Sequence, residues 1–303
     1  MSRYLVEPDP FPGPQPSHRA RVRVAARTDR GCERENNEDR AAFADLGSSV
    51  AFEPPAAAVL LPEPGAFVGL VCDGMGGEAG GEIASRLAVE TILPFLRAAT
   101  LAGAPEGRVA RALVASIEAA SARIQEEARA FPRLARMGTT ATLTALAEGS
   151  LVCAQVGDSR AYVLKRGALR QITRDQTMAE LLRSSGAIVA DGAHELVGAN
   201  VILQAVGASR RLDVALTHTP LDDGDVVLLC SDGLSGVVPD AAIAATLRDH
   251  ADPDAAAGAL VARALEAGAP DNVTCVVFRL ERRSGVGRDV ERAGVDLVDG
   301  EES

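Results

Sequence analysis

Three apolar runs in this chain each end in an aspartate. They are residues 68–72 before Asp73, residues 151–157 before Asp158, and residues 226–231 before Asp232. Short runs rich in Val, Leu and Cys are typical of buried strands, and a carboxylate at the end of such a strand is costly unless a counter-charge compensates it. The repetition predicts strand ends that converge on a shared cation.

Two further acidic motifs belong to this set, Asn37-Glu38-Asp39 and Asp271-Asn272. The ligands that all these motifs offer are oxygens, which suit a hard ion such as Mg²⁺ or Mn²⁺ better than they suit zinc. The sequence therefore predicts a site for hard divalent cations, built from segments far apart along the chain.

Arg34 precedes Asp39 by five residues. Arginine is the natural bidentate partner of a phosphate group. Carboxylate-bound metal ions together with an arginine are what phosphoester hydrolysis requires, because the metals activate water and neutralise the phosphate. Taken in isolation, Arg34 could instead pair only with Glu35 or Glu38.

The segment Asp73-Gly74-Met75-Gly76-Gly77 ends one of the apolar runs and precedes a helical pattern. Glycines let a backbone approach a ligand closely and expose its carbonyls. The same pattern also fits a phosphate cradle at a helix N-terminus or a simple tight turn. Neither nucleotide-binding pattern, G-x-x-x-x-G-K-[ST] or G-x-G-x-x-G, occurs in the sequence, which weakens nucleotide-loop interpretations.

Charge and composition narrow the class of protein. The net charge of −11 argues against nucleic acid or an anionic membrane surface as a partner. No apolar run is long enough to span a membrane, and the first residues lack the apolar core of a signal peptide. The five Cys form no C-x-x-C pair and fit small buried side chains in a reducing compartment. A cytoplasmic location is expected.

The pattern along the chain predicts one domain over residues 20–283 between two disordered tails. Residues 1–19 are Pro-rich and residues 284–303 are acidic. Within the domain we expect an inserted loop at 45–66 and a flap at 177–207. Two Ala-rich helices come early, two come late, and hairpin-linked strands fill the remainder. That order favours a sheet-on-sheet core flanked by helices over alternating βαβ units.

Seven motifs in this order resemble the metal-dependent protein phosphatase (PPM) family, the protein phosphatase 2C type, in its bacterial form. They are Asp29-x-Gly31-x-x-Arg34-x-x-Asn37-Glu38-Asp39, Asp73-Gly74-Met75-Gly76-Gly77, Gly138-Thr139-Thr140, Gly157-Asp158-Ser159-Arg160, Thr173-Arg174-Asp175, Ser231-Asp232-Gly233-Leu234 and Asp271-Asn272-Val273-Thr274. The resemblance covers residues 21–281. It implies an α+β fold, a four-layer α-β-β-α sandwich of two antiparallel sheets flanked by helices, with the metal centre at one end of the sheets.

Carried over position by position, the resemblance implies two bound Mn²⁺ or Mg²⁺ ions and a looser third. The implied ligands are Asp73, Asp232 and Asp271 for the first ion, Asp73, the Gly74 carbonyl and Asp39 for the second, and Asp158 with Asp232 for the third. Glu38 and Asn272 are implied either as ligands or as residues that position ligands. Arg34 would hold the phosphoryl group.

Some positions depart from the family pattern. Met75 stands where eukaryotic members often carry a histidine proposed as the general acid, and the four His of the chain lie outside the motifs. A bound water is then the expected proton donor to the leaving group. The family's Thr-x-Asp-His-Ser stretch reads Thr173-Arg174-Asp175-Gln176-Thr177, and the flap lacks the usual Arg-Asn pair. These departures concern substrate preference more than the metal site.

The resemblance implies a protein Ser/Thr phosphatase that opposes Ser/Thr kinases, with phosphorylated proteins as partners. One alternative is a phosphatase of an anti-sigma-antagonist-type regulator. Another is a catalytically weak module that only binds phosphoproteins, although degenerate members of that kind lose some of the metal and phosphate residues that are intact here. A purely structural Ca²⁺-binding protein is disfavoured because the chain has no EF-hand loop and such a protein has no need of Arg34.

Overall fold

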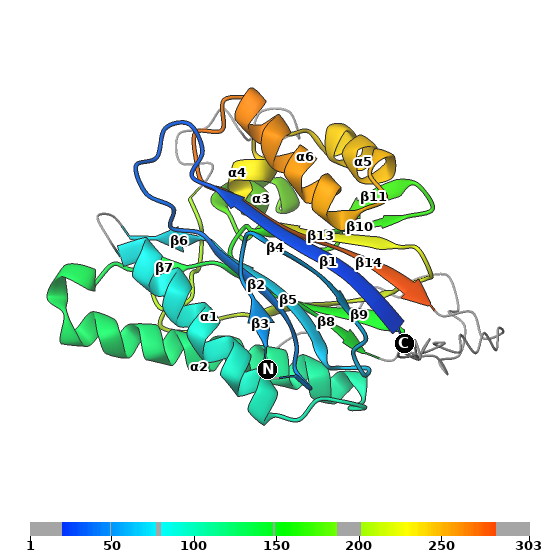
Figure 1. Cartoon of the computed structure of the whole chain (residues 1–303). Helices are drawn as coiled ribbons and strands as arrows, with labels where there is room; N and C mark the ends of the chain where they lie inside the picture. The colour runs from blue at the N-terminus through cyan, green and yellow to red at the C-terminus, as the bar shows by residue number, and fades with distance from the viewer. Residues whose placement is uncertain (1–19, 49, 77–79, 148, 187–200, 283–303) are drawn as a thin grey trace, which may run out of the picture.

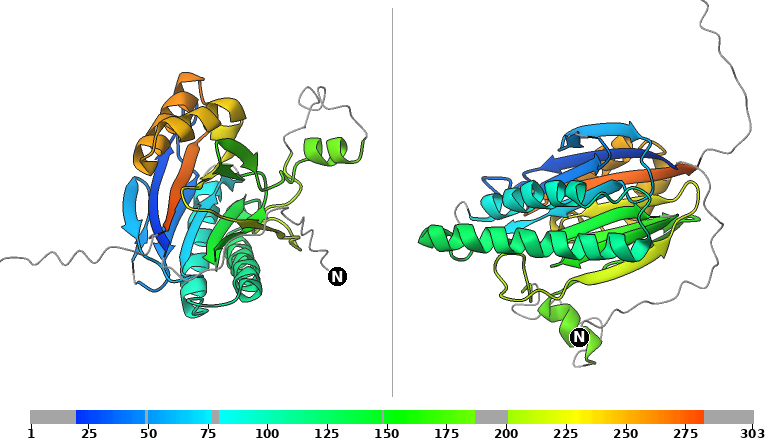
Figure 2. Two further views of the ribbon diagram at one scale, coloured as in Figure 1. Left: turned by 90° about the vertical axis from the view of Figure 1, so that its right-hand side faces the viewer. Right: turned by 90° about the horizontal axis from the view of Figure 1, so that it is seen from below.

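Two six-stranded sheets pack face to face, and helices cover their outer faces (Figures 1 and 2). This arrangement is that of a computed structural model, which describes residues 20–48, 50–76, 80–147, 149–186 and 201–282. The paired strands of both sheets are antiparallel. The predicted α+β sandwich with four layers is thereby confirmed.

The first sheet has the strand order β11-β10-β13-β14-β1-β4, and the second has the order β12-β9-β8-β5-β2-β3. The strands of the first sheet are Ala168–Gln171, Arg160–Lys165, Val226–Cys230, Val273–Arg282, Ala20–Asp29 and Ala56–Leu60, in that order. Those of the second are Ala215–Pro220, Ser150–Val156, Ala141–Ala147, Phe67–Cys72, Arg40–Asp45 and Ala51–Phe52. A short pair, β6 (Gly74–Met75) with β7 (Gly138–Thr139), extends from the end of the second sheet.

The helices form two outer layers, which Figure 2 shows on opposite sides of the sheets. The second sheet carries α1 (Gly80–Ala98) and α2 (Glu106–Ala130), and the first carries α4 (Asp232–Ser235), α5 (Asp240–Asp249) and α6 (Pro253–Glu266). A 3₁₀ turn, η1 (Pro132–Leu134), follows α2, and α3 (Met178–Ser184) lies at the periphery (Figure 2). No helix in the described ranges is both long and apolar enough to cross a membrane.

Helix boundaries follow local chemistry. Asp252 caps α6 by accepting a hydrogen bond from the Ala255 N–H at 3.2 Å, with Pro253 in the first turn. Thr177 caps α3 by accepting from the Glu180 N–H at 3.3 Å. On α2 the residues Val109, Leu113, Ile117, Ala120 and Ile124 are buried, which confirms the apolar face predicted from their spacing.

Among the described residues, four of the seven aromatic rings pack in the layer between the sheets. Phe67 and Phe278 meet edge to face with ring centroids 4.8 Å apart, and Phe43 stacks on Phe52 at 5.0 Å. The layers between sheet and helix are instead aliphatic, built mainly from Ala, Val, Leu and Ile. Strands β5, β8, β9 and β13 are buried along their whole length because each has a sheet on one side and helices on the other.

The segment 45–66 was predicted as a loop, but it contains β3 and β4. β4 pairs with β1, with Val22 opposite Leu60, and forms the edge of the first sheet. Its Ala-rich sequence has weak strand propensity, and the flanking prolines resemble loop signals, so pairing with β1 decides its structure. Gly77, the middle of the proposed flap (187–200), and the tails at 1–19 and 284–303 lie outside the described residues.

Candidate metal and phosphate site

Strand register brings the acidic motifs to one end of the sandwich. Arg40, which follows Asp39, lies opposite Cys72, which precedes Asp73. In the other sheet Cys230 lies opposite Cys275, so the ends flanked by Asp232 and Asp271 are adjacent. Neighbouring antiparallel strands run in opposite directions. An acid that follows one strand and an acid that precedes its neighbour therefore lie at the same end of the sheet.

Asp39 is buried at this end of the sandwich, with 2% of its surface exposed. Its Oδ2 accepts a hydrogen bond from the Ser231 hydroxyl at 2.7 Å. Its Oδ1 is buried and has no hydrogen-bond partner among the described residues. Burial, together with the charges of Asp232 and Asp271, raises the pKa of Asp39 to about 7, although hydrogen bonds from Thr274 and Ser231 oppose the rise.

Asp73 is fixed through its backbone by the strand beside it. Its N–H donates to the Thr140 hydroxyl at 2.9 Å, and its carbonyl accepts from the Thr140 N–H and the Thr139 hydroxyl, each at 2.8 Å. Burial first, and then the charges of four neighbouring aspartates, hold the pKa of Asp73 well above its ordinary value. Those aspartates are Asp39, Asp232, Asp158 and Asp271.

Asp232 and Asp158 complete the group. Burial and then the charge of Asp271 raise the pKa of Asp232, while a hydrogen bond with Asp73 opposes the rise. Burial and the charges of Asp232 and Asp175 raise the pKa of Asp158 to about 7. Each has a buried Oδ1 that lacks a hydrogen-bond partner in the described structure. The structure therefore brings Asp39, Asp73, Asp158, Asp232 and Asp271 into mutual electrostatic contact.

Arg34 lies at the exposed rim of this group. Its Nη2 donates to Asp271 Oδ2 at 2.7 Å, and its side chain is 54% exposed. Burial alone would lower its pKa, but the hydrogen bond with Asp271 and the charges of Asp271, Glu38 and Asp73 raise it overall. The structure places Arg34 against a predicted metal ligand and within reach of solvent.

Glu38 and Asn272 differ in kind, although the sequence suggested the same two roles for both. Burial raises the pKa of Glu38; the charges of Asp271 and Glu82 act in the same direction, and that of Arg34 opposes them. The Asn272 amide is instead saturated by main-chain bonds. Its Nδ2 donates to the carbonyls of Arg30 and Asn36 and its Oδ1 accepts from the Glu38 N–H, each at 2.8 Å. Asn272 thus holds the loop that carries Arg34 and Glu38.

Two positions, Gly74 and Gly81, must be glycine because other parts of the backbone pass too close for a side chain. A side chain at Gly74 would collide with the carbonyls of Gly81 and Glu38, and one at Gly81 would collide with the Glu38 carboxylate. The start of α1, the Gly74 turn and the Glu38 loop can therefore meet only because these positions lack a Cβ. The sequence reading included Gly74 but missed Gly81, whose partners are distant in the sequence.

Hydroxyl groups that position the acids were also missed as functional residues. Besides Ser231, Thr140 donates to or accepts from Ser159 Oγ at 2.7 Å, and Thr142 donates to the Ser159 carbonyl at 2.7 Å. Thr140, Ser159 and Ser231 all stand inside the recognised motifs. Because they stand next to or near the acids in the sequence, they could have been predicted to position those acids.

The residues of this site fit hard cations. Several carboxylates raise one another's pKa, and three of them have buried oxygens without a hydrogen-bond partner, which is costly unless a cation compensates. In the described ranges no three His, Cys, Asp or Glu side chains form a ready-made metal cage. Carboxylate and main-chain oxygens together with water are the ligands that Mg²⁺ and Mn²⁺ accept.

Comparison with known proteins points in the same direction. The family model described as protein phosphatase 2C matches residues 59–267. The chain is 36% identical over 258 residues to the serine/threonine protein phosphatase PstP of Mycobacterium tuberculosis, covering 84% of this chain and 44% of that protein. It is 30% identical over 251 residues to the serine/threonine phosphatase stp of Listeria innocua, covering 83% of this chain and 93% of that protein.

A solved structure adds a metal-bound relative. It is the catalytic domain of the serine/threonine protein phosphatase PstP in complex with two manganese ions, which matches with a TM-score of 0.70 and 32% identity, covering 86% of this chain and 99% of that one. The chain thus spans 44% of the full-length PstP sequence but nearly all of its catalytic domain.

Proposed function

The chain belongs to the protein phosphatase 2C family, and from that premise we propose that it is a metal-dependent protein Ser/Thr phosphatase. Its substrates would be phosphoserine and phosphothreonine in proteins, including Ser/Thr kinases and their targets. The observation that carries this proposal is the group of mutually repelling carboxylates with unpartnered oxygens beneath the exposed guanidinium of Arg34.

The carboxylates divide between two metal positions. Asp73, Asp232 and Asp271 would hold one ion, and Asp73, the Gly74 carbonyl and Asp39 the other, with Glu38 beside them. Asp158, with Asp232, would hold a third, looser ion. Bound Mn²⁺ or Mg²⁺ supplies a water of lowered pKa and neutralises phosphate charge. The protein keeps these oxygens in place through Thr140, Ser231 and Asn272.

Arg34 provides the phosphate contact. Asp271 accepts a hydrogen bond from Arg34 Nη2, and the Arg34 side chain is 54% exposed, which leaves other guanidinium N–H groups available to a substrate. Two parallel N–H donors match two phosphoryl oxygens. In the reaction water adds to phosphorus, the ester P–O bond breaks, and the leaving alkoxide takes a proton.

No histidine in the described residues supplies that proton. His218 pairs with Glu106, and His250 contacts the Thr246 carbonyl, both away from the acids. Water remains the proposed proton donor. The cysteines of the described domain are free thiols, which favours a reducing compartment, so a cytoplasmic location remains the prediction.

Hydrolysis assays test the proposal directly. p-Nitrophenyl phosphate and a phosphothreonine peptide are offered to the protein with Mn²⁺, Mg²⁺, Ca²⁺ or EDTA. We expect turnover with Mn²⁺ or Mg²⁺ and none with EDTA. Binding of the peptide without turnover would favour the phosphoprotein-binding module, and full activity in metal-free protein would overturn the proposal.

A further inference from the structure

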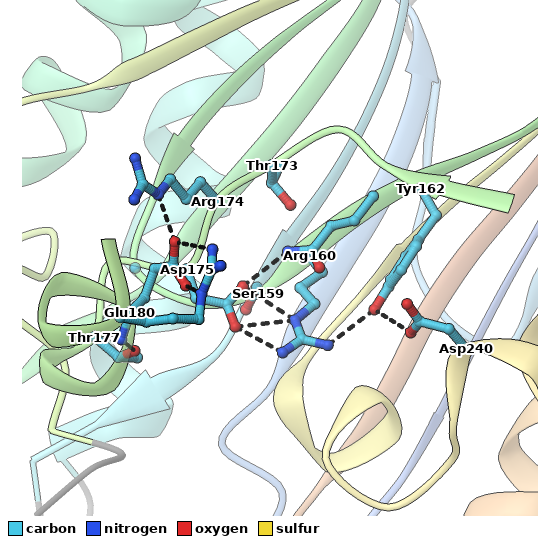
Figure 3. A network of polar contacts seen from close by, with 12 residues as sticks. Ser159, Arg160, Tyr162, Thr173, Arg174, Asp175, Thr177, Glu180 and Asp240 are labelled. Atoms are coloured by element: carbon cyan, nitrogen blue, oxygen red, sulfur yellow. Dashed lines mark hydrogen bonds and ion pairs between the residues drawn. The ribbon is translucent and has the colours of Figure 1, made fainter. Parts of the chain in front are cut away.

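Residues 173–176 lie along the turn that carries Asp158, and Figure 3 shows the central contact between them, from Arg160 to Asp175. Every residue of this short segment holds a residue of 155–161. The contacts are Ala161 N–H to Thr173 Oγ1 at 2.9 Å, Arg174 N–H to Gln155 Oε1 at 3.2 Å, Arg160 to Asp175, Gln176 N–H to the Gly157 carbonyl at 3.0 Å, and Gly157 N–H to Gln176 Oε1 at 2.7 Å.

The ion pair of Arg160 and Asp175 is the centre of this junction. Arg160 Nε donates to both carboxylate oxygens at 3.0 Å, and Nη2 donates to Oδ2 at 2.7 Å. Gln171 Nε2 donates to Oδ1 at 2.9 Å. The two side chains are only 24% and 19% exposed, in contrast to the arginines that pair with Glu180 on the surface.

The third guanidinium nitrogen of Arg160 is linked to the helix layer through Tyr162. Its Nη1 donates to the Tyr162 hydroxyl at 3.0 Å, and that hydroxyl donates to Asp240 Oδ1 at 3.2 Å, at the start of α5 (Figure 3). Tyr162 is completely buried. The planar guanidinium therefore serves two partners in fixed directions, which a lysine ammonium cannot reproduce.

The same segment is also the stem of α3. Thr177 caps that helix, the Leu203 N–H donates to the Gln176 carbonyl at 2.8 Å, and the Met178 N–H donates to the Val201 carbonyl at 2.9 Å. Residues 173–176 therefore lie between the turn that carries Asp158 and the α3 segment, by which we mean Thr177 and the helix Met178–Ser184 that it caps.

We propose that Arg160 is a positioning residue that couples the placement of Asp158 to the placement of the α3 segment. Arg160 lies in the turn itself, two residues after Asp158, and its side-chain hydrogen bonds in the described structure go to Asp175 and Tyr162 and not to α3. It holds Asp175, and through the stem it fixes both the turn that presents Asp158 and the base from which α3 departs. The role of Asp158 rests on the proposed function, but the coupling to α3 does not.

Hydrogen exchange in the metal-free full chain tests the α3 half of the coupling. Arg160→Lys is compared with Arg27→Lys, whose arginine also pairs with an aspartate, Asp254 of α6. We expect exchange of α3 amides such as that of Leu181, which bonds the Thr177 carbonyl, to rise about tenfold in Arg160→Lys alone. An equal rise at every amide, or no rise, would overturn the coupling.

Metal titration tests the Asp158 half. Arg160→Lys, Asp158→Asn and the double variant are titrated with Mn²⁺ by calorimetry. If Arg160 acts through Asp158, the weakest Mn²⁺ event weakens about tenfold in each single variant and no further in the double variant. Additive losses would overturn the proposal. If no variant, nor the wild type, binds Mn²⁺, the proposed function fails while the exchange result still stands.

Asp175→Asn serves if Arg160→Lys does not fold, because it removes the charge and keeps the shape of the carboxylate. It should reproduce both the exchange change and the weakened Mn²⁺ event. Kinetics add a separate signature, since a displaced α3 segment should raise KM for a phosphopeptide more than KM for p-nitrophenyl phosphate. An equal change for both substrates would contradict the α3 half.

Discussion

At the residue scale, the costly groups of this fold are the carboxylates at the strand ends. Asp39 and Asp158 are buried with pKa values of about 7, far above that of a free aspartate. Without a cation, burial and the neighbouring carboxylates favour the protonated form of each side chain. Ionising them therefore destabilises the metal-free fold. Metal affinity and pH dependence should therefore be linked.

The first prediction follows from the sign of that linkage in metal-free protein. A carboxyl whose folded pKa is raised contributes stability below its unfolded pKa of about 4. That contribution is lost as the pH rises to about 7 for Asp39 and Asp158. The Tm in EDTA should fall between pH 5 and pH 8, by less in Asp158→Asn. An identical fall in wild type and variant, measured by calorimetry, would show that Asp158 does not titrate in this window.

The second prediction concerns the ligands. Asp73→Asn and Asp232→Asn should each lower turnover of an aryl phosphate on the order of 10²-fold or more at saturating Mn²⁺, because metal-assisted activation of water is lost. Unfolding of the metal-free variants should occur at equal or higher temperature, since repulsion is relieved. Asp249→Asn, on the exposed end of α5, is the control. Near wild-type turnover in Asp232→Asn would remove Asp232 from the site.

The third prediction separates Arg34 from the ligands. Arg34→Ala should weaken substrate binding by about 1.5–3 kcal/mol, as expected for a charge-assisted hydrogen bond, and Arg34→Lys should recover only part. Mn²⁺ affinity should not fall, because the variant releases Asp271 from its ion pair.

Steady-state kinetics and calorimetric Mn²⁺ titration measure the two effects of Arg34. Arg30→Ala is the matched control from the same exposed loop, where the Arg30 guanidinium donates to the Glu35 carbonyl. Unchanged kinetics, or lost metal binding without another defect, would make Arg34 a purely structural partner of Asp271.

At the element scale, sequence reasoning succeeded where the signal is local. The buried runs before Asp73, Asp158 and Asp232 became β5, β9 and β13, because continuous apolar runs fit strands covered on both sides. It failed at β4, whose pairing with β1 is not encoded in its own residues. Contacts such as Ser231 to Asp39, 192 residues apart, depend on register between strands and could not be read locally.

The fourth prediction belongs to the loop that joins β1 to β2. Asn272→Ala leaves the carbonyls of Arg30 and Asn36 and the Glu38 N–H without their partner. Each intramolecular hydrogen bond contributes about 0.5–1.5 kcal/mol net, so the loss of these three bonds should lower the free energy of unfolding by roughly 1.5–4.5 kcal/mol. Urea unfolding measures it, with the exposed Asn36→Ala as control. A loss below that of the control would show that water replaces the Asn272 amide.

At the scale of the whole molecule, the layers could be predicted from the sequence, but the side-chain contacts between them could not. Helical and strand patterns gave the sandwich, since two helices before and two after the central strands leave few ways to cover two sheets. The junction of Arg160, Asp175 and Tyr162 depends on how the layers meet. It unites β10, the stem of α3 and the start of α5, which no single pattern connects.

The fifth prediction concerns the chain outside the sandwich. The described sheets and the core clusters between layers are complete within residues 20–282. A chain trimmed to residues 20–283 should therefore unfold cooperatively and hydrolyse p-nitrophenyl phosphate at the full-length rate. Calorimetry and kinetics on both chains check this, and a broad transition in the shorter chain would show that a tail stabilises the domain.

The absence of tryptophan turns the buried junction into an optical reporter. The chain has two tyrosines, Tyr4 and Tyr162, and only Tyr162 lies among the described residues. With no indole to accept its excitation energy, the emission of this ring can be observed directly. Its phenol contacts Arg160 and Asp240, so intensity and lifetime should respond to any displacement of the α3 stem. A Tyr4→Phe protein would carry a single tyrosine, packed between the first sheet and its own helix layer, and would report the contact of β10 with α5 without a label.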